Sequence, residues 1–350
     1  MPHKVRRLTF LATLAVLSVA SSGSFAKETK SRPTGAAGEP NRPAVIWREP
    51  ADIASRDLYY GPGGEEHQPH GPFAFVEEDL DGTSPKYVVR DRDEVKWTVK
   101  LGMEARPETV ASRLVWAAGY FANEDYFLED LRVDGMPAHL ARGQKLVGPD
   151  GTMRAARLKR HIGGEKNIAN WKWRDDPFDG TRELNGLKVM MALINNWDLK
   201  DENNKVYGDK DTGERMYIVS DLGASFGTTG LSYPFSHSKG DLNSYIHSKF
   251  INRVSGDYVD FRTPSRPSLI YAWWPSGFLS RVRLDGLVHH IPRDDASWIG
   301  HLLSRLSSGQ IRDAFRAAGY PKEQIDEFSK VVEDRIAALN DLTDDPKYRK

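Results

Sequence analysis

Alternating apolar and polar residues mark the first half of the chain. They predict strands joined by short turns, at residues 73–77, 86–90 and 95–101. In the third strand, Val95, Trp97 and Val99 alternate with polar residues that include Thr98 and Lys100. Because successive strand side chains point to opposite faces, Thr98 and Lys100 should share one face.

A change from period two to helical spacing follows. Residues 107–118 predict a helix that begins with a proline and ends before Gly119. Further strands are predicted at residues 126–133, 155–161 and 216–220. Apolar residues at helical spacing run from Leu184 to Ile194. Later helices are predicted at residues 294–306, 308–318 and 321–339.

The order of these elements predicts an α+β fold with two lobes. A strand-rich lobe is expected over residues 73–162 and a helical lobe over residues 163–345. Residues 27–72 are rich in Gly, Pro and charged residues, which predicts a disordered or irregular leader. Two lobes of this kind enclose a cleft between them.

The N-terminus has the pattern of a signal peptide. Lys4, Arg6 and Arg7 precede an apolar run that extends to Ala20, and small residues precede a cleavage position after Ala26. We therefore expect residues 1–26 to be removed and the protein to be exported, to the periplasm or the extracellular space. A membrane anchor is the alternative, although the run is short for a span.

Composition narrows the classes of function. The 350 residues carry 49 basic and 49 acidic side chains, so the chain lacks the basic excess of most nucleic-acid-binding proteins. There is no cysteine, so an exported chain would depend on its core rather than on disulfides. With 39% hydrophobic residues, such a core is available. After signal cleavage no stable membrane span is expected.

The strongest local signal follows the Met-rich helix. It is the segment 197–204, Trp-Asp-Leu-Lys-Asp-Glu-Asn-Asn, and the triplet Asp221-Leu222-Gly223 follows a later strand. Phosphoryl transfer from ATP requires a carboxylate near the acceptor hydroxyl, hard oxygen donors for a divalent metal and a lysine for the phosphates. Residues of these types stand in this order along the chain.

The two segments resemble the catalytic loop and the metal-binding triplet of protein kinases. This resemblance implies that Asp198 is the base-like residue and that Lys200 contacts the transferring phosphate. It also implies that Asn203 and Asp221 hold Mg²⁺ or Mn²⁺, with Asn204 as the alternative to Asn203. The extra length between the two segments is assigned to a hairpin over residues 206–215.

The resemblance extends upstream, to cover residues 73–230. Lys100 corresponds to the lysine of the small lobe, and Thr98 on the same face is expected to touch the adenine. Glu108 on the next helix is the expected partner of Lys100, with Glu104 as the alternative. The turn between the first two strands is expected to form the phosphate lid, through Gly82, Thr83 and Ser84.

Some features depart from regulated protein kinases. Trp197 stands where an arginine usually precedes the catalytic aspartate, and the lid lacks a Gly-x-Gly-x-x-Gly pattern. The chain is more similar to the atypical branches, namely the secreted-pathway, spore-coat and phosphoinositide-kinase-like enzymes. The implied reaction moves the γ-phosphoryl group of ATP to a hydroxyl of a protein or a small molecule, and no nucleic-acid partner is expected.

Other interpretations remain open. A kinase-like protein that binds without catalysing would keep the same residues. Gly223 to Gly227 also matches Gly-x-Ser-x-Gly, which makes Ser225 the candidate nucleophile of a serine hydrolase. A third feature is a basic run made of Arg154, Arg157, Lys159 and Arg160, for which we expect a solvated face.

Overall fold

The structure is a computed structural model that describes residues 42–82, 84–163, 166–228, 238–263 and 282–344. The predicted signal peptide at residues 1–26 and the lid residue Thr83 lie outside the described residues. No helix among the described residues is long and apolar enough to cross a membrane.

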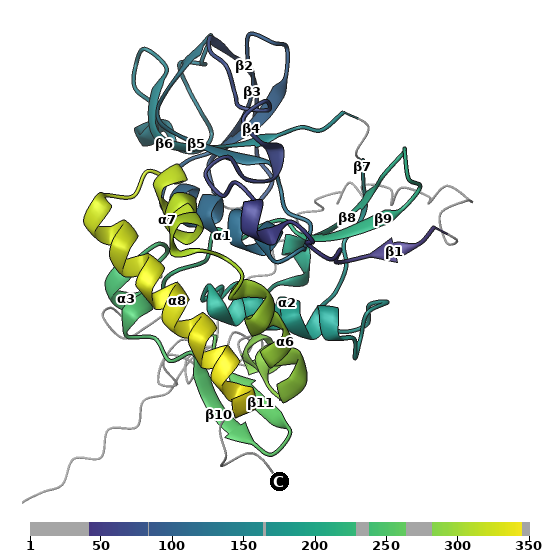
Figure 1. The fold of residues 1–350 in the computed structure, drawn as a ribbon. Coiled ribbons are helices and arrows are strands. Elements are labelled where there is room, and N and C mark those ends of the chain that lie inside the picture. Colours follow the sequence, from purple (N-terminus) through teal and green to yellow (C-terminus); the bar gives the residue numbers. More distant parts are fainter. Residues whose placement is uncertain (1–41, 83, 164–165, 229–237, 264–281, 345–350) are drawn as a thin grey trace, which may run out of the picture. The chain divides into compact units, whose positions relative to one another are not determined.

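The first half of the chain forms a closed barrel (Figure 1). Its order is β2-β3-β4-β6-β5, in which β6 pairs with both β4 and β5. The strands are β2 (Phe73–Asp79), β3 (Lys86–Arg90), β4 (Lys96–Lys100), β5 (Asp125–Asp134) and β6 (Thr152–Arg160). As the alternation predicts, Trp97 and Val99 point into the barrel core, together with Leu158 from β6.

One helix, α1 (Ala105–Ala117), interrupts the barrel strands between β4 and β5. It packs against β5 and β6 on one side and against a helix of the second half, α7 (Ser308–Ala317), on another. Its apolar residues Val110 and Leu114 belong to the core of the second half rather than to that of the barrel. The helix therefore connects the two halves.

The second half is mainly helical. Besides α7 it contains α2 (Arg182–Leu193), α3 (Leu242–Ile246), α6 (Arg293–Leu303) and α8 (Lys322–Asp344). Helix α2 begins at Thr181, whose hydroxyl accepts a hydrogen bond from the amide of Leu184. A small antiparallel sheet, not predicted from the sequence, contains β10 (Ile251–Ser255), β11 (Tyr258–Phe261) and β12 (Ile291–Pro292).

Two strands of a four-stranded sheet adjoin the segments 197–204 and 221–223 in the sequence. Its order is β1-β9-β8-β7, with β1 (Ala44–Val45), β7 (Lys166–Ala169), β8 (Asn204–Gly208) and β9 (Arg215–Val219). The predicted hairpin is present as β8 and β9. Strand β1 comes from the leader, pairs in parallel with β9, and is followed by buried Ile46, Ile53 and Leu58.

These elements confirm the predicted α+β class, with a strand-rich first part and a helical second part. Each strand and helix predicted from its periodicity is present within a few residues of the predicted bounds. Residues 42–72 form the short strand β1 and two 3-10 turns, Ile53–Ser55 and Gly61–Gly63, and the apolar side chains just described place this segment in the core.

A buried arginine on α8 holds the end of α2. The guanidinium of Arg335 donates to the carbonyl oxygen of Leu193 at 2.8 Å, to Oδ1 of Asn195 at 3.0 Å and to Oγ of Ser248 at 2.8 Å. Its Cζ also lies 4.1 Å from the ring centroid of Tyr245. Because Asn195 lies two residues before the segment 197–204, this arginine fixes where the loop begins.

Replacing Arg335 by methionine should lower the free energy of unfolding by about 3 kcal/mol, because several buried acceptors lose a charged donor. The matched control is Lys330→Met on the same helix, whose side chain is 72% exposed and pairs with Asp334. The control should change stability by less than about 0.5 kcal/mol. Urea unfolding of both variants measures the difference, and equal losses would contradict the assigned role.

Candidate functional site

Lys100 lies at the centre of a buried cluster of charges. Its Nζ lies 2.8 Å from Glu104, 2.9 Å from Glu108 and 3.0 Å from Asp221. Burial acts to lower the pKa of Lys100, but Glu108 and Asp221 outweigh it, and the pKa is raised. The lysine therefore stays charged and joins β4, α1 and the segment after β9.

The sequence left Glu104 and Glu108 as alternatives, and the structure brings both to Lys100. They lie four residues apart, so they share one face of the helix start. The two glutamates differ in surroundings, since the side chain of Glu108 is 1% exposed and that of Glu104 is 14% exposed.

Glu104 also connects two loops to the lysine. Its carboxylate accepts a hydrogen bond at 3.0 Å from the hydroxyl of Ser84 in the predicted lid, and it pairs with Lys239. A Cβ atom on Gly223 would lie 2.7 Å from the Cβ of Glu104, so the third position of the Asp-Leu-Gly triplet has room only for glycine.

Asp221 is a half-buried carboxylate whose charge is strongly stabilised. Burial acts to raise its pKa, but the Lys100 ammonium at 3.0 Å opposes burial and lowers the pKa of Asp221 to about 2. Its Oδ1 also accepts a hydrogen bond from the amide of Gly223 at 3.2 Å. The preceding residue is fixed as well, because Asn123 donates to the carbonyl oxygen of Ser220 at 2.8 Å.

The segment 197–204, which resembles a kinase catalytic loop, is compact and lies between α2 and β8. The side-chain Nδ2 of Asn203 donates to the backbone carbonyl oxygen of Asp198 at 2.7 Å, so the two ends of the motif are joined. Lys200 lies 2.8 Å from the carboxylate of Asp198. Because this side-chain hydrogen bond uses Nδ2, the side-chain oxygen Oδ1 of Asn203 is available as a metal ligand.

A cleft of about 580 Å³ receives residues from both halves of the chain. Lys100, Asn203 and Asp221 line it, together with Thr98 and Gly82, whereas Ser84 and Asp198 are not among its lining residues in the described chain. The hydroxyl of Thr98 lies 2.7 Å from Nε2 of His161. Six of the predicted residues therefore line one cleft, namely Gly82, Thr98, Lys100, Glu108, Asn203 and Asp221. Asp198, Lys200 and Ser84 do not line it, but Asp198 is hydrogen-bonded to Asn203 and Ser84 to Glu104.

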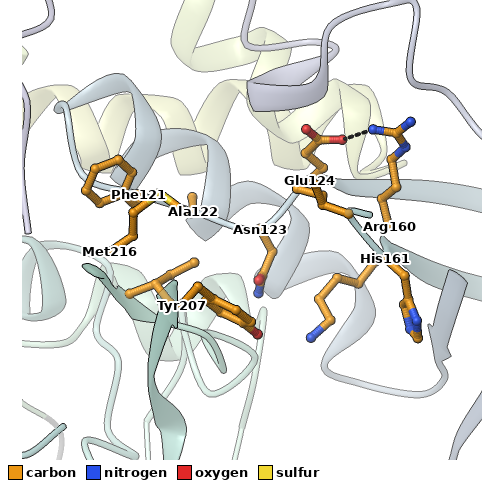
Figure 2. A pocket seen from close by; sticks show the side chains of 11 residues that line it. Phe121, Ala122, Asn123, Glu124, Arg160, His161, Tyr207 and Met216 are labelled. Atoms are coloured by element: carbon orange, nitrogen blue, oxygen red, sulfur yellow. Dashed lines mark hydrogen bonds and ion pairs between the residues drawn. The ribbon is translucent and has the colours of Figure 1, made fainter. Parts of the chain in front are cut away.

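A smaller pocket of about 280 Å³ adjoins the cleft, and both are lined by Lys159 and Tyr207. Figure 2 shows Phe121 and Met216 on one side of this pocket and Arg160 and His161 on the other. Arg160 pairs with Glu124 at 3.2 Å. The apolar side of this pocket, formed by Phe121 and Met216, differs from the cleft, which is lined mainly by charged and amide side chains.

The expectation of a solvated basic run is wrong for Arg157. This side chain is 4% exposed and lies inside, 2.5 Å from Glu108 and 3.3 Å from Asp125. Lys159 also turns toward the cleft, and burial lowers its pKa. By contrast Arg154 faces solvent, with 85% of its side chain exposed. Arg157 and Lys159 are two residues apart on a strand and so share one face, but the alternation of a strand does not tell which face is buried.

The donor set suits a divalent metal. Within the described residues, carboxylate oxygens of Glu104, Glu108 and Asp221 lie within 4.8 Å of one another. The ammonium of Lys100 contacts all three of these side chains, and Asn203 lines the same cleft as Asp221. Mg²⁺ and Mn²⁺ prefer carboxylate and amide oxygens, so Asp221 and Asn203 fit the ion that the resemblance implies.

The position of Ser225 does not support a hydrolase site. Its side chain is fully buried, and its hydroxyl has no hydrogen-bond partner among the described residues. A nucleophilic serine needs a general base within hydrogen-bond distance and an open path to the substrate. Ser225 has neither within the part of the chain that the structure describes.

Comparisons with known proteins add distant likenesses. The chain matches no protein-family model and no curated protein. It is similar to the solved structure of a Helicobacter pylori proinflammatory kinase, CtkA, at 10% identity and a TM-score of 0.42, over 76% of this chain and 95% of that one. It is also similar to the Golgi casein kinase, at 10% identity and a TM-score of 0.35, over 78% and 74%. Because both TM-scores are low, the kinase-like character of the fold rests on the arrangement described above.

Replacing Lys100 by methionine should leave the surrounding carboxylates without their shared cation. We expect the free energy of unfolding to fall by about 3 kcal/mol at neutral pH. Since Asp221 has a lowered pKa, its pairing with Lys100 stabilises the fold above about pH 4 and is lost as the pH falls toward 2. The difference in free energy of unfolding between the wild type and Lys100→Met should therefore become smaller below about pH 4.

Urea unfolding between pH 3 and pH 8 measures this dependence. The matched control is Lys96→Met on the same strand, where the lysine is exposed. A deficit for Lys100→Met that stays constant over the whole range would show that the carboxylates do not depend on the lysine.

Proposed function

We propose that this chain, which has an atypical protein-kinase-like fold, moves the γ-phosphoryl group of ATP to a hydroxyl group. The observation that carries the proposal is the meeting of Lys100, Asn203 and Asp221 in one cleft, with Asp198 joined to Asn203 at the cleft's edge. A lysine, two oxygen ligands and a carboxylate are the groups that phosphoryl transfer requires.

In this proposal Asn203 and Asp221 hold Mg²⁺ or Mn²⁺ through their side-chain oxygens. The ion neutralises charge on the phosphate oxygens. Lys100 binds the phosphates, and Glu108 keeps the lysine in place. Gly82, Thr83 and Ser84 cover the phosphates from the lid, and Thr98 lies toward the base.

Asp198 orients the acceptor hydroxyl and accepts its proton as the new phosphorus–oxygen bond forms and ADP leaves. Lys200, which lies 2.8 Å from that carboxylate, stabilises negative charge on the transferring group. Both groups are on the short loop between α2 and β8, so they approach the acceptor from the helical half.

A second candidate is a kinase-like protein that binds a ligand without transferring a phosphoryl group. The contacts of Lys100 favour it, because three carboxylates already surround the ammonium. An incoming phosphate must compete with them. The two candidates share the cleft and differ in whether transfer follows binding.

We further propose that the protein is exported, on the basis of the signal-peptide pattern that ends at Ala26. The acceptor is a protein or a small molecule with a free hydroxyl. Nucleic acid is not proposed as a partner, since the charges of the chain balance.

Calorimetry with ATP should detect binding that depends on Mg²⁺ or Mn²⁺. Asp221→Ala should abolish this dependence, because a metal ligand is lost. Asp198→Asn should keep the binding but lower the transfer rate by about 10²- to 10⁴-fold, because the base is lost. Asp211→Ala, at an exposed position of the β8–β9 hairpin, is the control and should change neither.

The outcomes separate the candidates. Binding without transfer in the wild type supports the non-catalytic protein. Absence of metal-dependent nucleotide binding in the wild type contradicts the proposed function.

A further inference from the structure

Arg157 on β6 joins three elements through buried ion pairs. Its guanidinium lies 2.5 Å from Oε1 of Glu108 on α1 and 3.3 Å from Asp125 on β5. At most 4% of each of these three side chains is exposed. Lys100 contacts the other carboxylate oxygen of Glu108, so this glutamate has one cation on each oxygen.

Helix α1 is held on its other sides as well. Buried Arg113 donates to the carbonyl oxygen of Tyr59 at 3.1 Å and to that of Tyr60 at 3.4 Å, which ties the helix to the leader. Val110 and Leu114 lie in the same apolar core as residues of α7. The helix is therefore fixed by the leader, the helical half and Arg157 together.

The position of the equivalent helix is what regulation acts on in many protein kinases, because the lysine–glutamate pair must form before transfer. Such control needs two positions of similar free energy. Here, moving α1 away from β6 would separate Glu108 from Arg157 and leave buried charges without partners, which is strongly unfavourable. A second position of α1 with similar free energy is therefore not available.

We infer that Arg157 is a positioning residue that holds α1 and Glu108 permanently where Lys100 requires them, so that the site is assembled without an activating modification. The consequence for phosphoryl transfer rests on the proposed function. The fixed position of α1 is independent of the proposed function, because it can be measured without nucleotide.

Amide hydrogen exchange of the wild-type full-length chain tests the fixed helix. The slowest amides of α1 should exchange about as slowly as those of α8, which reports opening only by global unfolding. Addition of ATP with Mg²⁺ should slow the slowest amides of α1 and α8 by the same factor, because a bound ligand raises the free energy of global unfolding. An α1 that exchanges more than about 100-fold faster than α8, or that gains more protection than α8 on adding nucleotide, would overturn the inference.

Variants then test the residue itself. Arg157→Met should speed exchange in α1 at least about tenfold more than in α8, and Arg157→Lys should restore most of the protection because the charge remains. Arg154→Met, an exposed position on the same strand, is the control and should match the wild type. Unchanged α1 exchange in Arg157→Met would refute the role.

If Arg157→Met does not fold, Arg157→Lys and the Glu108→Gln/Arg157→Met double variant decide, since the double variant leaves no unpaired charge on Glu108. Faster α1 exchange than in the wild type is expected in the double variant, and wild-type exchange there would refute the role. A wild type that binds no nucleotide contradicts the proposed function while leaving the exchange result to stand.

Discussion

The ammonium of Lys100 is the contact on which the arrangement of the site depends. One side chain connects a barrel strand, the start of α1 and the segment after β9, because three carboxylates share it. Buried charges are unfavourable without partners, so each of these elements is held close to the others. The cleft exists where these elements meet, and its charged lining follows from the residues that balance one another there.

This cluster differs from a single lysine–glutamate pair in how it distributes charge. Glu108 is balanced by two cations, and Glu104 reaches both the lid and Lys239. A change at any one member alters the electrostatic surroundings of the rest. The site behaves as one network, in which β4, α1, β6, the turn at Ser84 and the segment at Lys239 are coupled through a few carboxylates.

The sequence predicted those parts of the fold that depend on local spacing. Alternation around Lys100 identified its strand, and the separation of Asp198 from Asn203 identified a single loop. The burial of Arg157 could not be predicted in this way, because the alternation of a strand does not tell which face meets a partner. Its partners Glu108 and Asp125 come from other elements, and only tertiary packing brings them together.

The packing of the leader could not be predicted from the sequence either. Its Gly- and Pro-rich composition predicted irregular chain, but composition says nothing of where such a segment packs. Ile53 lies in the same core as residues of α1 and α7, and Gln310 of α7 donates a hydrogen bond to its carbonyl oxygen. The choice between Glu104 and Glu108 was likewise open, since helical spacing brings both to the lysine.

The contacts of the leader also determine the order in which the chain can complete its fold. Ala44 pairs with Arg215, and the carbonyl oxygen of Ile53 accepts a hydrogen bond from Gln310, 257 residues further along. Contacts so distant in sequence form slowly, and a ribosome makes the leader long before its partners. The segment around Ala44 and Ile53 must therefore stay undocked until α7 has been synthesised. Its entry into the core depends on the synthesis of the last helices of the chain.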